Sequence, residues 1–284
     1  MADWTSVGLA GLALGVGSAV VWGGADFSGG VATRRAHAFQ ILVLISLAGC
    51  ALMALVAVAA GGPRPSPADF AFAAAAGVSG AFGVTALYRG LASRSAAIVA
   101  PTASVVGTVT AVAAGIALQG APTPAQWLGF VVGATGISMV ARAPRAGASE
   151  RNRSLLLATV SGVFIGGFLV LLAQVKAENV FGPLAVAKAA GAVVGVVVLL
   201  VLRMPTVSFR RHPLAILAGV LDAGGNLLFM LASRLIRLDV AAVLSSMAPV
   251  VTVLLSKWIL KEAVSRAQWA GIALCFVAVV LLSG

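Results

Sequence analysis

Charged residues are scarce in this chain of 284 residues. They make up 10% of it, whereas roughly 25% is usual in a soluble domain. This scarcity excludes a water-soluble domain, because there is too little charge to cover its surface. The net charge of +11 does not indicate a nucleic-acid partner, because the basic residues lie mostly in short segments between apolar runs. That placement is typical of membrane topology signals and of contacts with lipid headgroups.

Histidine and cysteine are scarce too, which argues against catalysis and metal binding. The only histidines, His37 and His212, lie in connecting segments, and no Ser/His/Asp, HExxH or paired-acid pattern is evident. Cys50 and Cys275 lie inside apolar runs without a CxxC pair, as packing thiols do. We expect no enzyme, no metal and no cofactor. A membrane-embedded enzyme and a pore stay as distant alternatives.

Apolar residues dominate the chain, at 61% of the residues with a mean hydropathy of +1.08. Ten runs are long enough, or nearly so, to cross a hydrocarbon core of about 30 Å as helices. They are 7–28, 38–60, 70–91, 96–118, 125–141, 155–175, 181–202, 213–232, 240–260 and 268–282. The alternating segments of a membrane β-barrel are absent. The sequence therefore predicts an all-α integral membrane protein with ten transmembrane helices.

Two short strings occur twice in the sequence. LASR at 91–94 returns at 231–234. AQW at 125–127 returns at 267–269, and both copies of AQW are followed by a glycine two residues on, Gly129 and Gly271. Each copy closes an apolar half, so a unit of about 140 residues has been duplicated. An internal repeat of this kind decides the architecture.

The duplication divides the chain into two halves. We predict a five-helix repeat at 1–143, a basic linker at 144–153 and a second five-helix repeat at 154–284. Five is an odd number, so the second repeat starts on the opposite side of the membrane from the first. Such inverted repeats place a substrate site near the membrane midplane, between the two halves.

The basic residues predict the orientation in the membrane. Thirteen of them lie in the connections 1–2, 3–4, 5–6, 7–8 and 9–10, and four lie on the other side. Because cytoplasmic loops carry the excess of lysine and arginine, both termini are expected outside the cytoplasm, in the periplasm of a bacterial inner membrane. The first basic residue is Arg34, so the basic segment of a cleavable signal peptide is missing and we expect the first helix to be retained.

Several motifs carry a family resemblance. The WGGADF string at 22–27 resembles the W-G-x-x-[N/D]-F signature of the EamA-type drug/metabolite transporter superfamily. SSMAPV at 245–250, with Lys261, Glu262 and the QWAG string at 268–271, is similar to that family's later P-V…L-x-E…Q-x-x-G segment. Overall the chain looks most like the bacterial YddG-type amino-acid exporters. The resemblance implies ten helices, inverted five-helix repeats and transport of small organic solutes, often outward.

The chain also departs from the family pattern. The first repeat has Gly107 where the second has Pro249, and Gly120 where the second has Glu262, so the halves have diverged. Many relatives have cytoplasmic termini, which conflicts with the orientation that the basic residues predict.

Four ionisable residues lie inside the apolar runs, where charge is costly and usually functional. They are Asp26, Arg89, Lys188 and Asp222. Asp222 shares a helical face with Asn226 and Ser233, and three placements stay open for it: a solvated cavity, a structural pair with Lys188 or another cation, or the membrane interface. Arg89 and Lys188 either meet a substrate carboxylate or extend to the interface, which we favour for Arg89.

Asp26 has two interpretations of equal weight. It binds protons or a cationic amine inside the membrane, because loss of water favours the neutral acid. Alternatively it caps the helix end or pairs with Arg34 or Arg35 in the headgroup zone.

The other candidates follow from the resemblance and the repeat. Trp22 and Tyr88 lie on helices that the resemblance places around a central cavity, and Phe229 stands at the position equivalent to Tyr88. The remaining cavity candidates are Ser245 and Ser246. Pro101 and Pro249 are hinge candidates, because proline bends a membrane helix and frees a carbonyl.

The sequence thus predicts a secondary transporter that exports small metabolites, amino acids foremost, by alternating access. The alternative is an exporter of hydrophobic or cationic drugs that uses an intramembrane aspartate. The expected partners are a small-molecule substrate and membrane lipid, without nucleic acid, and the expected assembly is a monomer or weak homodimer. No ATPase motif is present, so energy comes from a gradient or from the solute itself.

Overall fold

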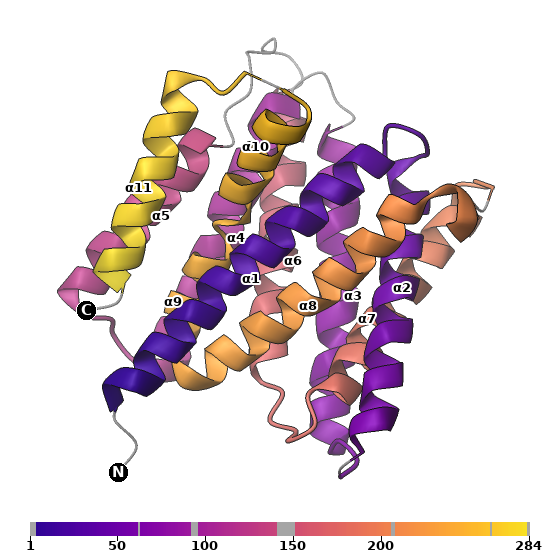
Figure 1. The fold of residues 1–284 in the computed structure, drawn as a ribbon, viewed down its shortest axis with the longest axis horizontal. Coiled ribbons are helices and arrows are strands. Elements are labelled where there is room, and N and C mark those ends of the chain that lie inside the picture. Colours follow the sequence, from indigo (N-terminus) through magenta and orange to yellow (C-terminus); the bar gives the residue numbers. More distant parts are fainter. Residues whose placement is uncertain are drawn as a thin grey trace.

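A computed structural model describes residues 4–61, 63–91, 96–140, 151–205, 208–261 and 263–282. Within these ranges the chain is helical and contains no strand (Figure 1). The helices are α1 (Trp4–Ala32), α2 (Ala38–Ala60), α3 (Pro67–Leu91), α4 (Ala96–Gln119), α5 (Pro124–Val140), α6 (Arg151–Ala173), α7 (Phe181–Val201), the 3₁₀ turn η1 (Phe209–Arg211), α8 (Pro213–Leu235), α9 (Leu238–Ser245), α10 (Ala248–Ile259) and α11 (Arg266–Leu282).

The predicted fold class is confirmed. Among the described residues, eight helical spans are long and apolar enough to cross a membrane, one of them formed by α9 and α10 together. The helices α5 and α11 are two further apolar helices of 17 residues each. Helices satisfy every backbone hydrogen bond internally, which lipid cannot do, so long apolar runs have no other stable form.

The packing of the helices repeats between the two halves. Helix α1 packs on α8 as α6 packs on α3, and α2 packs on α8 as α7 packs on α3. Helices α2 and α7 pack on each other across the two halves, and α5 and α11 form a separate pair at one edge of the molecule (Figure 1). Exchanging the halves therefore leaves these main pairs of neighbours unchanged. Helix α1 rises from the N-terminal end and α11 descends to the C-terminal end, so both ends lie on one side.

Two glycine contacts show the repeat in atomic detail. Gly77 of α3 lies against the carbonyl oxygen of Ala187 in α7. Gly219 of α8 lies against the carbonyl oxygen of Ile45 in α2, where a Cβ atom would come within 2.5 Å of it. The second contact joins the residues equivalent to those of the first, 142 positions away. Small residues at these points let the backbones approach closely, as membrane helices often require.

The predicted crossing at 240–260 is present as the span Leu238–Ile259, but in two helical pieces, because the helix breaks between α9 and α10 at residues 246–247. Pro249 has no N–H group, so the carbonyl of Ser245 receives no helical hydrogen bond from it. The hydroxyl of Thr252 in α10 donates to the carbonyl of Gly23 in α1, at 3.1 Å, and ties the second piece to the first helix. Helix α4, the counterpart in the first half, is continuous.

Some sequence predictions fall on residues that the structure does not describe. They are most of the linker at 144–153, Glu262, and the side chains of Tyr88 and Pro101. The backbone of α4 is helical through position 101. The exact boundaries of the two halves and the hinge role of Pro249 stay predictions.

Candidate functional site

A cavity of about 960 Å³ lies between the two halves of the bundle. Seven of the long helices and the α9–α10 break contribute to its walls. Its lining includes Trp22, Asp26, Thr33, His37, Leu42, Ser46, Gly80, Val84, Leu87, Arg89, Ser104, Thr108, Ile165, Phe168, Leu169, Lys188, Asp222, Asn226, Ser245, Ser246 and Pro249. Four helices that lie far apart in the sequence thus bring together all four of the ionisable residues that the sequence analysis singled out.

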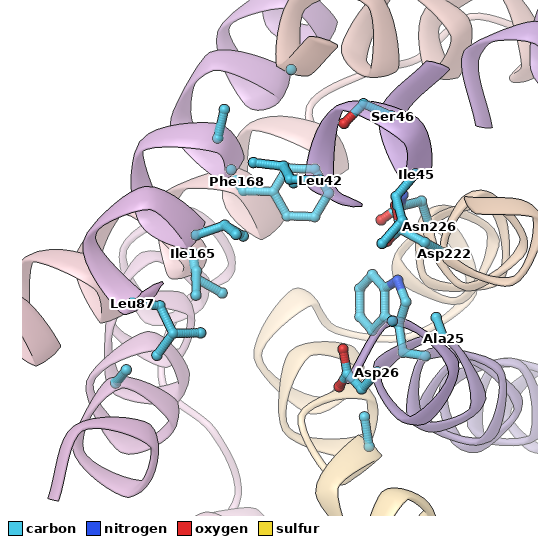
Figure 2. Close-up of a pocket in the computed structure, with 18 of the residues that line it drawn as sticks. Ala25, Asp26, Leu42, Ile45, Ser46, Leu87, Ile165, Phe168, Asp222 and Asn226 are labelled. Carbon is cyan, nitrogen blue, oxygen red and sulfur yellow. The ribbon is translucent and has the colours of Figure 1, made fainter. Parts of the chain in front are cut away.

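One wall of the cavity is polar. Asp26 of α1, Ser46 of α2, and Asp222 and Asn226 of α8 lie on the same side in Figure 2. Lys188 of α7 joins them, because its ammonium group forms an ion pair with the Asp222 carboxylate. The two charged side chains are 11% and 29% exposed, so this pair is largely withdrawn from water. Asp222 thus lies in the cavity and in an ion pair, which combines two of its three expected placements.

Asp26 faces the cavity with a free carboxylate (Figure 2). Helix α1 continues beyond it to Ala32, so the alternative that Asp26 caps the end of the helix is wrong. Among the described residues it has no hydrogen-bond or ion-pair partner. In the part of the chain that the structure describes, the cavity therefore holds one carboxylate paired with an ammonium group and one carboxylate without a partner.

Asn226 is the most unusual polar residue of the wall. It is 1% exposed, and neither its Oδ1 nor its Nδ2 atom has a hydrogen-bond partner in the described part of the chain. A buried amide left in this way costs about 1–3 kcal/mol, and a native structure keeps such a group only for a reason. Asn226 belongs to the cavity lining, so a solute or a water molecule that reaches its amide is the partner that can satisfy it.

Trp22 of the cavity lining packs on Phe229. Their rings stack with centroids 6.0 Å apart and an angle of 26° between the planes. Phe229 is fully buried and lies behind Trp22, not in the lining of the cavity. The indole of Trp22 in turn lies against Gly225 of α8. The two aromatic rings therefore hold α1 against α8 and fix where the polar wall stands.

The opposite wall is apolar. Leu87 of α3 and Ile165 and Phe168 of α6 face the polar residues across the cavity in Figure 2. Gly80 and Val84 of α3 and Leu169 of α6 complete this wall. Sequence reasoning selected ionisable and aromatic residues, so it missed these positions and also Ser46. The internal repeat could have identified three of these positions, because Ser46, Gly80 and Val84 each lie 142 positions before a polar residue of the site.

Among the described residues, the lining of the cavity extends to one end of the bundle. The cavity is lined by Thr33, Ala36 and His37 at the connection between α1 and α2, and by Arg89 at the end of α3. Within the described ranges, no residue of the connections α2–α3, α6–α7 or α8–α9 lines it. The structure thus represents a state in which the cavity is accessible from the end that bears the α1–α2 connection.

The other end is closed by polar contacts around the α6–α7 loop. The carboxylate of Asp69, at the start of α3, accepts a hydrogen bond from the backbone N–H of Lys176, at 2.6 Å. From the opposite side, the guanidinium group of Arg234 in α8 donates to the carbonyls of Val175 and Ala177, at 3.2 and 2.7 Å. One loop of the second half is thus held between a helix of the first half and a helix of its own half.

The second polar contact of the closed end involves Arg237 and Asp239. Their side chains form an ion pair at 2.7 Å, and the Asp239 carboxylate is fully buried. Arg237 also donates to the carbonyl of Gly120 in the α4–α5 connection, at 2.7 Å. The connections of both halves are therefore joined at this end.

This arrangement is that of a membrane transporter: a helical bundle built from two inverted repeats, with a cavity between the repeats that opens to one side. The chain belongs to the EamA-like transporter family, whose sequence model matches residues 9–142 and again residues 152–284. One solved crystal structure has a similar fold, with a TM-score of 0.75 over 96% of each chain and 21% sequence identity. At that identity the likeness concerns the fold alone. No curated protein matches the sequence.

Proposed function

We propose that this transporter exports small zwitterionic metabolites, amino acids foremost, across a bacterial inner membrane by alternating access. The observation that carries the proposal is the composition of the polar wall. It offers the free carboxylate of Asp26, the ammonium group of Lys188 and the unpartnered amide of Asn226. A zwitterion needs an acceptor for its ammonium group and donors for its carboxylate, and this wall supplies both within one cavity.

The accessible end of the cavity supports the outward direction. The cavity reaches the α1–α2 connection, which belongs to the side that carries thirteen lysine and arginine residues. By the positive-inside rule this side faces the cytoplasm. In that orientation the observed state loads solute from the cytoplasm, and the contacts of Asp69 and Arg234 close the periplasmic end.

Export of hydrophobic cations is the second candidate, and one observation favours it. Asp26 has no partner among the described residues, so it can hold an amine without breaking an existing contact. Asp222 is a poorer anchor, because its carboxylate is already paired with Lys188. The cavity would then need only Asp26, and Lys188 and Asn226 would play no part in recognition.

Counterflow in proteoliposomes separates the two candidates. Purified protein is screened with labelled neutral amino acids and with cationic dyes, first as wild type and then as Asp26→Asn. If amino acids are the substrates, their flux persists in Asp26→Asn at reduced apparent affinity, because Lys188 and Asn226 still hold the carboxylate. If cations are the substrates, dye flux is lost in Asp26→Asn.

Asp69→Asn is the matched control, because it removes the same charge at the closed end of the bundle and leaves the cavity lining intact. It is expected to keep the substrate preference of the wild type. A protein that moves no amino acid under any imposed gradient would overturn the primary proposal.

A further inference from the structure

The repeat supplies an internal comparison for every residue of the cavity. Ile165 of α6 packs on Gly83 of α3, where a Cβ atom would come within 2.7 Å of it. Trp22 of α1 packs on Gly225 of α8 in the equivalent place. Helices α1 and α6, and likewise α8 and α3, therefore occupy matching positions, and the side chains at matching positions can be compared directly.

Helices α2 and α7 match in the same way. Gly49 of α2 lies close to the Cδ atom of Lys188, and a Cβ atom there would stand 3.4 Å from it. Gly191 of α7 lies close to the hydroxyl of Ser46, at 3.8 Å by the same measure. Lys188 and Ser46 are thus equivalent residues, each packed on the equivalent glycine of the other half.

These equivalences show that the two walls of the cavity have diverged. Three residues of the polar wall have smaller or apolar counterparts on the apolar wall: Asp26 matches Leu169, Asp222 matches Gly80, and Asn226 matches Val84. Lys188 matches the smaller Ser46, which lies on the polar side of the cavity as well. The polar side is built mainly from α1, α7 and α8, and the apolar side from α3 and α6 (Figure 2). A cavity shaped by two-fold symmetry has therefore lost that symmetry in its chemistry.

An asymmetric cavity favours a solute that is itself asymmetric. A polar or charged group placed against Val84, Leu87 and Ile165 loses its water, and none of these three side chains offers it a hydrogen bond, which is costly. An apolar group there is withdrawn from water at a gain. The opposite holds for the wall with Asn226, whose amide is left unsatisfied by an apolar group.

We infer that Asn226 and its repeat counterpart Val84 determine specificity, and that together they select zwitterions with an uncharged, apolar side chain. Asn226 binds the zwitterionic head beside Lys188 and Asp26, and Val84 contacts the side chain of the solute. The cavity volume of about 960 Å³ leaves room for side chains of different sizes, so polarity and not size is the property selected. The inference rests on the proposed function, because it names the class of amino acid that this site takes.

Competition in the counterflow assay tests this inference. Leucine and asparagine are the probes, because they have similar size and the same head group and differ in the polarity of the side chain. The wild type is expected to prefer leucine by about tenfold or more, the ratio set by one unpaired polar group. In Val84→Asn the leucine-to-asparagine ratio should fall by about tenfold, because the amide of the variant meets that of asparagine.

Two further variants separate polarity from other effects. Val84→Leu changes the volume at the same position without changing its polarity, and should leave the preference for leucine unchanged. Asn226→Val removes the head-group contact and should weaken both probes by about tenfold while leaving their ratio unchanged. A ratio measured within one variant does not depend on the fraction of protein that folds.

The possible failures are distinguishable. Counterflow of amino acids without a preference for leucine in the wild type overturns the inference and leaves the proposed function intact. A ratio that does not change in Val84→Asn overturns it as well. If Val84→Asn gives no counterflow, two other results test the inference. They are the preference of the wild type for leucine and an equal weakening of both probes in Asn226→Val. Absence of any amino-acid counterflow overturns the proposed function, and the inference with it.

Discussion

At the scale of single residues, the Lys188–Asp222 pair combines recognition with stability. A pair that is only 11% and 29% exposed has lost most of the water that would solvate its charges. Its attraction compensates for that loss only as long as both partners are present. Helices α7 and α8 make few other contacts with each other than this pair, so the ion pair also links two helices of the second half.

Removal of one partner should therefore destabilise the protein. In Lys188→Met the Asp222 carboxylate stays in the cavity without its cation and beside the free Asp26. We expect a loss of about 1–3 kcal/mol, less than for a fully buried pair because water reaches the cavity. Thermal unfolding of the detergent-solubilised protein would measure it as a lower Tm.

The double variant Lys188→Met/Asp222→Leu is the control for this loss. Because it leaves no uncompensated charge, it should recover most of the stability while losing transport. A double variant as unstable as Lys188→Met would show that the lysine stem, packed near Gly49, matters more than the charge.

At the scale of elements, the closed end of the bundle depends on one loop. The segment between α6 and α7 is held by Asp69 from α3 and by Arg234 from α8. Hydrogen bonds to charged groups are the stronger ones, at about 1.5–3 kcal/mol each. Alternating access requires this end to open, so these contacts must break in each transport cycle.

Arg234→Ala should make the closed end open more often. A cysteine introduced at Ser46, inside the cavity, is then expected to react several times faster with a membrane-impermeant thiol reagent added from the closed side. The background is a variant with Cys50 and Cys275 replaced by alanine. Arg210→Ala, at the opposite end of the bundle, is the matched control and should leave that rate unchanged. An unchanged rate in Arg234→Ala would show that the loop is held mainly by Asp69.

At the scale of the whole molecule, the even number of membrane crossings places both termini on one side, and the basic connections lie on the other. Thirteen basic residues on one side against four on the other predict cytoplasmic basic connections. The direction of the accessible cavity, and with it the direction of loading, follows from this orientation.

Two exposed loop positions test the orientation. A cysteine at Thr123, in the α4–α5 connection, should react with an impermeant thiol reagent applied to intact cells stripped of their outer membrane. A cysteine at Ser208, between α7 and α8, should react only after the inner membrane is made permeable. The reverse pattern would place the termini in the cytoplasm. The cavity of the observed state would then open to the periplasm.

The amino-acid sequence by itself determined the fold class, the number of crossings and the repeat. Backbone groups in lipid must be hydrogen-bonded within the segment, so the helix is the structure that a long apolar run adopts there. The pattern of apolar runs also survives changes in individual side chains, which is why short repeated strings were enough to show the duplication. The sequence did not show where the bend in the 240–260 run falls: the helix is interrupted at residues 246–247, next to Pro249 and the contact of Thr252 with α1.

Only the tertiary structure decided how the polar residues of the site are arranged. The sequence left open whether Asp222 faces a cavity or pairs with Lys188, because residues 34 positions apart on different helices meet only through packing. It gave no sign that Asn226 is buried without a partner, since this depends on what the neighbouring helices fail to provide. The division into a polar and an apolar wall arises in the same way, because it appears only when the equivalent residues of two inverted repeats face one cavity.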